Sequence, residues 1–162
     1  MTDMLRPVPV DIEPKRKNRF VIEFPADLGF SEWMVQTSSR PHFTMGDVAI
    51  PYMNTETHVA GRASWNSISI TFIDPIGPSA SQKVMEWVRQ CIEPSTGRMG
   101  YATNYKKQLV LKMLDPAGIP VEKWVLYGCF ITDANFGDLD TGGEELATVT
   151  ISIRYDRAIL EF

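Results

Sequence analysis

The chain has 162 residues, of which 44% are hydrophobic, and this is enough for one domain with a sizeable core. Its formal net charge is −4, which argues against a protein that grips nucleic acid, because neutralising phosphates needs clustered surplus lysine and arginine. The N-terminus has no signal-peptide pattern and no window approaches a membrane span, so we expect a cytoplasmic chain without membrane insertion.

Residues 1–18 form the first predicted segment. They carry Pro7, Pro9 and Pro14 and a basic run at 15–17, without a periodicity that would bury one face. We interpret them as an extended N-terminal arm, and a loose tail with no role is an equal alternative. Residues 19–162 are expected to form a single β domain.

Short strands dominate the sequence after the arm. In the first half, Pro and Gly bound predicted strands at 19–24, 33–38, 47–50 and 57–60. Two further strands, at 67–73 and 109–114, each run into an Asp-Pro-x-Gly sequence, at 74–77 and 115–118. Such a sequence suits a type I turn, because Asp caps the turn amides and Pro presets φ.

Two strands have an apolar face and a hydroxyl-rich face. In the last strand the apolar residues Val149, Ile151, Ile153 and Tyr155 alternate with Thr148, Thr150, Ser152 and Arg154. The strand at 67–73 alternates in the same way, with Ser67, Ser69 and Thr71 on its polar side. Each strand therefore covers a core and shows a smooth polar surface.

One helix is predicted, at about 79–93. It begins with a capping-box pattern at Ser79, and its apolar stripe consists of Val84, Trp87, Val88 and Cys91. The outward face is formed by Lys83, Glu86, Arg89 and Gln90. A single helix of this length cannot cover a sheet of about eight strands, so the sheets must cover each other in a mainly β sandwich or barrel-like fold. Open edges then remain, which partner subunits can satisfy.

No pattern in the chain indicates catalysis. His42 and His58 lie in no motif that presents a nucleophile, and we expect both to be structural or solvated. The acidic residues at 138–145 could hold a hard cation, but the EF-hand spacing is absent and a solvated loop is the favoured interpretation. Cys91 and Cys129 are too few for a disulfide framework, and we expect both to be buried.

Several segments together resemble the tail tube proteins of contractile-tailed, T-even-like bacteriophages. The resemblance covers nearly everything from Asn18 onward. The segments that carry it are Phe20 to Phe24, Ile50 to Asn54, Phe72 to Ala80, Gly97 to Tyr101, Tyr105 to Lys107, Asn135 to Asp140, Glu145 to Thr150 and Arg154 to Ala158. It implies a tail-tube β domain with one flanking helix, in the fold family of the inner tubes of type VI secretion and other contractile injection systems.

The resemblance also implies a function without catalysis and without cofactors. Such subunits form hexameric rings that stack into a hollow tube, in which strands from all six copies close one inner barrel. The expected partners are the sheath protein, baseplate and tail-terminator proteins, and a tape-measure protein in the lumen. DNA passes through during genome ejection without specific binding, and the tube is part of the virion, assembled in the bacterial host cytoplasm.

Three surfaces are expected to carry these contacts. The first is ring stacking, for which the loop at Pro51, Tyr52, Met53 and Asn54 is the first choice. The arm 1–18 and the C-terminal residues 159–162, including Leu160 and Phe162, are second choices. The second is the lumen wall, for which the hydroxyl-bearing residues Ser67, Ser69, Thr71, Thr148, Thr150 and Ser152 are the candidates, because a surface poor in lysine does not arrest a passing polyanion. The third is a sheath contact through Lys83, Glu86, Arg89 and Gln90.

Three alternatives stay open from the sequence. One is the inner tube of a phage-derived injection system that delivers protein. More remote are a metal-dependent hydrolase, which would use Asp138, Asp140, Glu144 and a histidine, and a monomeric β-sandwich binding module. Electron microscopy discriminates among them, since only a tube subunit forms rings or hollow tubes.

Overall fold

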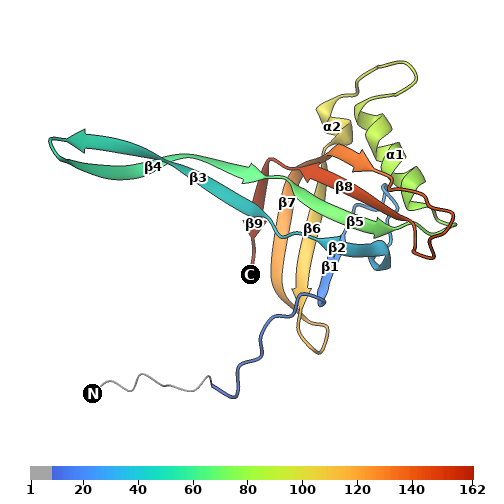
Figure 1. Ribbon diagram of the computed structural model, residues 1–162, viewed down its shortest axis with the longest axis horizontal. Coiled ribbons are helices and arrows are strands. Elements are labelled where there is room, and N and C mark those ends of the chain that lie inside the picture. The colour runs from blue at the N-terminus through green and yellow to red at the C-terminus, as the bar shows by residue number, and fades with distance from the viewer. Residues whose placement is uncertain (1–8) are drawn as a thin grey trace.

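A computed structural model describes residues 9–162 and shows a mainly β body from which one long hairpin projects (Figure 1). The part of the predicted arm before residue 9 lies outside the described residues. The helical elements are the 3-10 helix η1 (Glu32–Met34), α1 (Ala80–Cys91) and the one-turn α2 (Ala102–Tyr105). The strands are β1 (Phe20–Glu23), β2 (Val35–Ser38), β3 (His42–Tyr52), β4 (Thr55–Asn66), β5 (Ile68–Ile73), β6 (Lys107–Leu114), β7 (Pro120–Asn135), β8 (Thr148–Arg154) and β9 (Arg157–Leu160).

The long strand β7 joins two antiparallel groups of strands. Its first half pairs with β6 and β9, and its second half pairs with β8, which gives the order β1-β6-β7-β8-β5-β2. The strand changes groups near Gly128, which has a φ of 68° and where a Cβ would lie 2.1 Å from a carboxylate oxygen of Asp156. Only glycine fits this bend. The expected sandwich or barrel-like mainly β fold is confirmed.

The core lies between the two groups of strands and beneath α1. Phe72 of β5 is fully buried and stacks on Phe30, with ring centroids 4.9 Å apart, while Phe24 lies 5.7 Å from it. Trp87 of α1 is also buried, and its indole nitrogen donates to the backbone oxygen of Tyr105 at 2.9 Å. The helix is therefore held to the body both by apolar packing and by one partly buried hydrogen bond.

The predicted helix is confirmed, but the turn before it differs from the prediction. Ser79 caps α1 by accepting from the amide of Gln82, as the capping box requires. Asp74 does not close a type I turn on itself. Its carboxylate instead accepts hydrogen bonds from Ser79, Ala80 and Ser81, at the start of the helix. The second predicted turn is confirmed, since Gly118 N donates to Asp115 O at 3.0 Å.

The two short strands expected at 47–50 and 57–60 are parts of a much longer hairpin. β3 and β4 pair with each other from His42↔Asn66 to Tyr52↔Thr55, with one irregularity between Met45 and Asp47. Nearly all of their residues are exposed, so no buried face marked the full length in the sequence. The strand expected at 33–38 is shorter, because Trp33 belongs to η1 and β2 begins at Val35.

Candidate functional site

The hairpin of β3 and β4 presents apolar side chains to solvent over its whole length. Phe43, Met45, Val48, Ile50 and Val59 are each 43 to 53% exposed, although strand residues of this kind normally pack on a core. In the described structure β3 and β4 pair only with each other, so the outer edge of each strand is open. An exposed apolar surface with open strand edges is a surface for another protein chain.

The tip of the hairpin is the turn that the sequence singled out. Tyr52 and Met53 are 70% and 87% exposed, and Pro51 and Asn54 beside them are exposed as well. Met53 has a φ of 52°, which is uncommon for a residue with a side chain. Thr55 closes the turn by donating its hydroxyl to Tyr52 O at 2.9 Å. The expected loop is thus a tight turn at the far end of the hairpin of β3 and β4.

Aromatic rings fix the root of the hairpin to the body. Trp65 of β4 lies between Phe43, at a centroid distance of 4.8 Å, and Tyr155, at 6.0 Å. The amide of His42 donates to the hydroxyl of Tyr155 at 3.3 Å. Burial raises the pKa of the Tyr155 phenol, although the bond from His42 opposes this rise. These contacts set the direction in which the hairpin leaves the body.

A buried carboxylate links the arm, the hairpin root and β7. Glu122 is only 6% exposed, and its oxygens accept from Trp124 Nε1 at 2.6 Å, from Lys15 Nζ and from Arg40 Nη1 at 3.5 Å. Burial acts to raise the pKa of Glu122, but the bonds from Lys15 and Trp124 and the two cationic charges outweigh it, so the pKa is lowered. Glu122 is therefore charged at neutral pH and anchors the arm.

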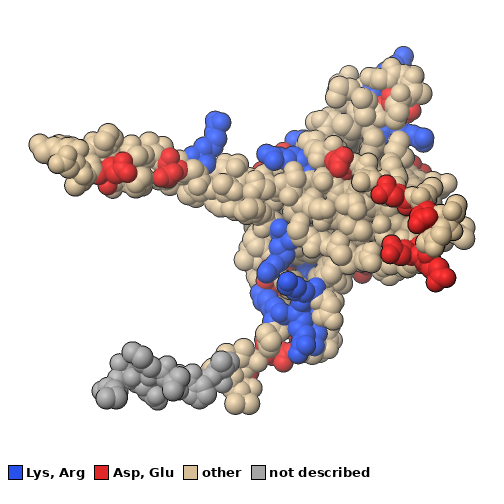
Figure 2. Space-filling view, viewed as in Figure 1, with Lys and Arg blue, Asp and Glu red and all other residues tan. Residues whose placement is uncertain are grey.

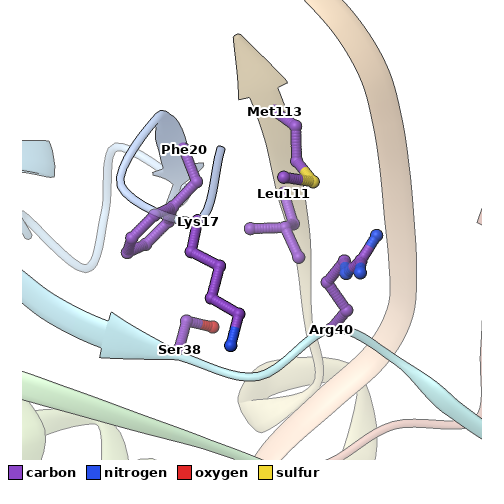
Figure 3. Close-up of a pocket in the computed structure, with 6 residues that line it drawn as sticks. All are labelled: Lys17, Phe20, Ser38, Arg40, Leu111 and Met113. Atoms are coloured by element: carbon purple, nitrogen blue, oxygen red, sulfur yellow. The ribbon is translucent and has the colours of Figure 1, made fainter. Parts of the chain in front are cut away.

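A cleft of about 270 Å³ lies beside this carboxylate, between the arm, β2 and β6 (Figure 3). Its walls combine two cations, a hydroxyl and three apolar side chains: Lys17, Arg40, Ser38, Phe20, Leu111 and Met113. Figure 2 shows a group of Lys and Arg side chains between the arm and the hairpin root, with others on the hairpin and near the helices. The cleft suits an occupant that is both acidic and apolar.

The two hydroxyl-rich strand faces lie side by side on one surface of the body. Ser69 pairs with Ser152 and Thr71 with Thr150 in the register of β5 and β8, and the two threonine hydroxyls are 3.2 Å apart. Thr148 lies at the end of the same face, opposite Ile73. None of the six predicted residues is buried, whereas the alternate residues form the core. The predicted facing of the strands is confirmed.

The outer face of α1 is only partly as predicted. Glu86 and Arg89 are exposed, but Lys83 and Gln90 are half-buried. The ammonium group of Lys83 lies against Gly29, where an added Cβ would be 2.6 Å from Nζ. The Oε1 atom of Gln90 is buried and has no hydrogen-bond partner in the described structure. Lys83 and Gln90 thus point partly toward neighbouring loops, which the helical period alone did not reveal.

The ionisable groups considered for chemistry are dispersed. His58 is about half exposed, with Nδ1 3.0 Å from Asp47 and Nε2 3.5 Å from Glu56. His42 is exposed and its Nδ1 lies 3.0 Å from the side-chain amide of Asn66. The loop holding Asp138, Asp140, Glu144 and Glu145 is exposed. Within residues 9–162, no three His, Cys, Asp or Glu side chains converge as metal ligands would.

The cysteines and the C-terminus complete the predicted sites. Cys129 is fully buried, and burial raises its pKa to about 12, whereas Cys91 is half-buried, so the expectation of burial is met only by Cys129. Leu160 ends β9 and Phe162 follows it, and both are 50% or more exposed.

None of the helices in the described part of the chain is long and apolar enough to cross a membrane.

Comparisons with known proteins point to one family. Residues 16–159 match the protein-family model described as "T4-like virus tail tube protein gp19". No curated protein sequence matches at a significant level.

Solved structures share the fold at low sequence identity. A chain of the anti-feeding prophage tube-terminating cap is 17% identical with a TM-score of 0.74, and the match covers 99% of each chain. A chain of the sheath-tube complex of an extracellular contractile injection system is 15% identical with a TM-score of 0.71 over 91% of each chain. Hcp1 from Flavobacterium johnsoniae is 12% identical with a TM-score of 0.55, over 88% of this chain and 94% of that one.

Proposed function

The chain belongs to the T4-like virus tail tube protein family, a family of structural tail tube proteins of contractile, phage-like particles, and from this premise we propose how it assembles and what it conducts. Six copies form a ring, and rings stack into a hollow tube. The tube stands inside a contractile sheath and conducts genomic DNA during ejection. The subunit performs no catalysis and needs no cofactor.

The observation that carries the stacking proposal is the exposed hairpin of β3 and β4. A two-stranded hairpin is at best marginally stable in water without a partner for its apolar side chains. This one projects from the body (Figure 1), and its tip exposes Tyr52 and Met53. A neighbouring ring would cover these side chains and both open strand edges. Pro51 and Asn54 belong to the same contact, and Leu160 and Phe162 are the second candidate for it.

Ring closure follows from two free strand edges in the body. β2 ends the strand order on one side, and the second half of β7, from Phe130 to Asn135, pairs only with β8 in the described structure. If β2 of one copy lies beside this part of β7 of the next, the strands of six copies form a single closed barrel. Closure removes the exposed edges, which favours the ring over the monomer.

The hydroxyl-rich surface of β5 and β8 is then the wall of the lumen. Its hydroxyl groups belong to Ser67, Ser69, Thr71, Thr148, Thr150 and Ser152, and these residues carry no positive charge. A polyanion therefore meets hydroxyl groups that form no ion pairs with its phosphates, so it can slide without being held. The same surface can contact a tape-measure protein during assembly.

The remaining partners are inferred from where related chains occur. Similar chains belong to a sheath-tube complex, a baseplate and a tube-terminating cap. We infer that this chain likewise contacts sheath, baseplate and terminator proteins, with Glu86 and Arg89 of α1 on the sheath side and Lys83 and Gln90 at its margin. The tube forms in the host cytoplasm and ends in the virion. Because these neighbours include extracellular contractile injection systems, a tube that delivers protein is the second candidate.

Electron microscopy of the purified protein tests the proposal. Wild-type protein is expected to form rings or hollow tubes, with or without added baseplate. Tyr52→Asp should leave folded, soluble subunits that form rings but do not extend into tubes, because a charge at the tip cannot be buried in the next ring. Tyr101→Asp is the matched control, since Tyr101 is 81% exposed on another loop. Normal tubes from Tyr52→Asp would overturn the stacking contact.

A further inference from the structure

The loop between β7 and β8, residues 136–147, is the most acidic exposed segment of the body. It contains Asp138, Asp140, Glu144 and Glu145 and no lysine or arginine. Two leucines of the same loop also face solvent, with Leu139 92% and Leu146 71% exposed. Within the described residues no ion pair involves its carboxylates. The loop thus offers uncompensated negative charge next to apolar side chains.

The cleft beside Glu122 has the complementary character. Lys17 and Arg40 supply positive charge at its rim, and Phe20, Leu111 and Met113 supply an apolar floor. Arg40 is 61% exposed and shares only one long contact with Glu122, so most of its five donors stay available. Lys17 is exposed and forms no ion pair within residues 9–162. Lys15 holds this part of the arm in place through Glu122.

The two surfaces lie at opposite ends of the body, without the hairpin. Figure 1 shows the hairpin leaving the body at one end and the β7–β8 loop closing the other, and Figure 2 shows acidic side chains at the loop end. The basic side chains gather near the hairpin root. Copies stacked in one direction along the hairpin axis would bring the acidic loop of one copy to the basic cleft of the next. Such a contact is head-to-tail and can repeat without limit.

We propose that the β7–β8 loop of one copy docks into the basic cleft at the hairpin root of a copy in the neighbouring ring. The carboxylates of the loop pair with Lys17 and Arg40, and Leu139 covers the apolar floor of the cleft. The inference rests on the proposed ring stacking and adds a second contact to the hairpin tip. It also gives the tube its polarity, because two acidic loops or two basic clefts repel each other.

Reversing charge on each surface tests the pairing. The loop variant carries Asp138→Lys and Glu144→Lys, and the cleft variant carries Lys17→Glu, which spares the Arg40 contact to Glu122. Each variant alone should form rings, and its yield of tubes should fall roughly tenfold at low salt, because like charges then face each other. An equal mixture of the two variants should recover tubes, since each loop meets an opposite cleft in an alternating stack.

The control variant carries Arg98→Glu in the exposed loop after α1, which reverses one charge on a surface outside the proposed contacts, and it should form tubes as the wild type does. Carbodiimide cross-linking of a tube made from labelled and unlabelled wild-type subunits should join Lys17 of one copy to the acidic loop of another. Three outcomes would overturn the docking alone: tubes from either variant at wild-type yield, no recovery in the mixture, or tubes without this cross-link. A wild-type protein that forms neither rings nor tubes would overturn the proposed function as well.

Discussion

The strands of the body and the strands of the projecting hairpin contain similar apolar residues, which are buried in the body and exposed in the hairpin. Val149 and Ile151 in β8 are fully buried, whereas Val48 and Ile50 in β3 are about half exposed. Both pairs lie in regular antiparallel ladders. The difference is therefore not in propensity for strand but in what lies against each face. In the body a second group of strands covers the apolar residues, and in the hairpin we propose that another subunit does so.

This contrast indicates that the body determines the stability of the monomer and that the hairpin determines its assembly. The body buries its apolar side chains within one chain, so its folding free energy does not depend on partners. The hairpin contributes little to that free energy, because its side chains gain little burial in the monomer. Changes in the body should thus alter unfolding, and changes in the hairpin should alter polymerisation.

The largest effect is expected from Phe72→Ala in the body. Phe72 is fully buried and stacks on Phe30, so its loss should reduce the free energy of unfolding by about 3 to 5 kcal/mol. Val48→Ala in the hairpin should change it by less than about 0.5 kcal/mol. Urea unfolding followed by tryptophan fluorescence at equal protein concentration measures both. Comparable losses in the two variants would mean that the hairpin is part of the folding unit.

The next largest effect is expected at Glu122, which links the arm and the root of the hairpin to β7. Glu122→Gln removes the charge that binds Lys15 and Arg40 and should cost about 1 to 3 kcal/mol at neutral pH. Since the pKa of Glu122 is lowered on folding, its stabilisation is present above the unfolded pKa and is lost as the pH falls through the folded one. The difference between wild type and variant should therefore shrink below about pH 4.

Proteolysis of the arm gives a second measure of the contacts of Glu122. Trypsin should cut the variant faster than the wild type at Lys15, Arg16 and Lys17, because the arm is no longer held against β7. Glu86→Gln on the exposed face of α1 is the matched control and should change neither unfolding nor cleavage. An arm that is cut equally fast in the wild type and in Glu122→Gln would show that this carboxylate does not anchor it.

The body could be predicted from the sequence because each of its elements buries one face. Alternation in β5 and β8 identified which side chains enter the core, and the capping box at Ser79 located the start of α1. These signals are local and repeat with the period of the element. The six hydroxyl-bearing residues were found for the same reason, since they are the alternate positions of the same strands.

The hairpin and the Glu122 cluster could not be predicted in the same way. No burial periodicity marks β3 and β4, so only fragments around 47–50 and 57–60 stood out. Glu122 meets Lys15 across 107 positions of sequence, and no local pattern specifies that pairing. One signal was present: an acidic residue two positions before Trp124 on the same strand face. A buried acid in a strand needs a donor, which could have directed attention to the basic arm.

A smaller effect is expected at the helix cap, far from the hairpin. Asp74→Ala removes the acceptor for the amides of Ala80 and Ser81 and should cost about 1 kcal/mol, with tube formation unchanged. Burial acts to raise the pKa of Asp74, but the bonds from Ser81, Ser79 and Ala80 lower it overall, so this stabilisation is present above the unfolded pKa and is lost as the pH falls through the folded one. Asp115→Ala removes the acceptor of only one turn amide, that of Ile119, and should cost less; thermal unfolding of the two variants compares them.

The smallest effect on folding, and the sharpest on function, is expected from Thr150→Lys. Thr150 lies outside the core beside Thr71, so a lysine there can extend from the surface and should change stability by less than about 0.5 kcal/mol. In a tube, each ring would repeat the added charge around the lumen, and double-stranded DNA would be retained with a strong dependence on salt. Glu86→Lys also places a lysine on the surface, on α1 and outside the proposed lumen, and should not retain DNA that enters the tube. Filter binding of DNA to sedimented tubes compares them. Equal retention by the two variants would remove β5 and β8 from the lumen wall, and the exposed polar strands of the body would then have to face another partner, as the hairpin does.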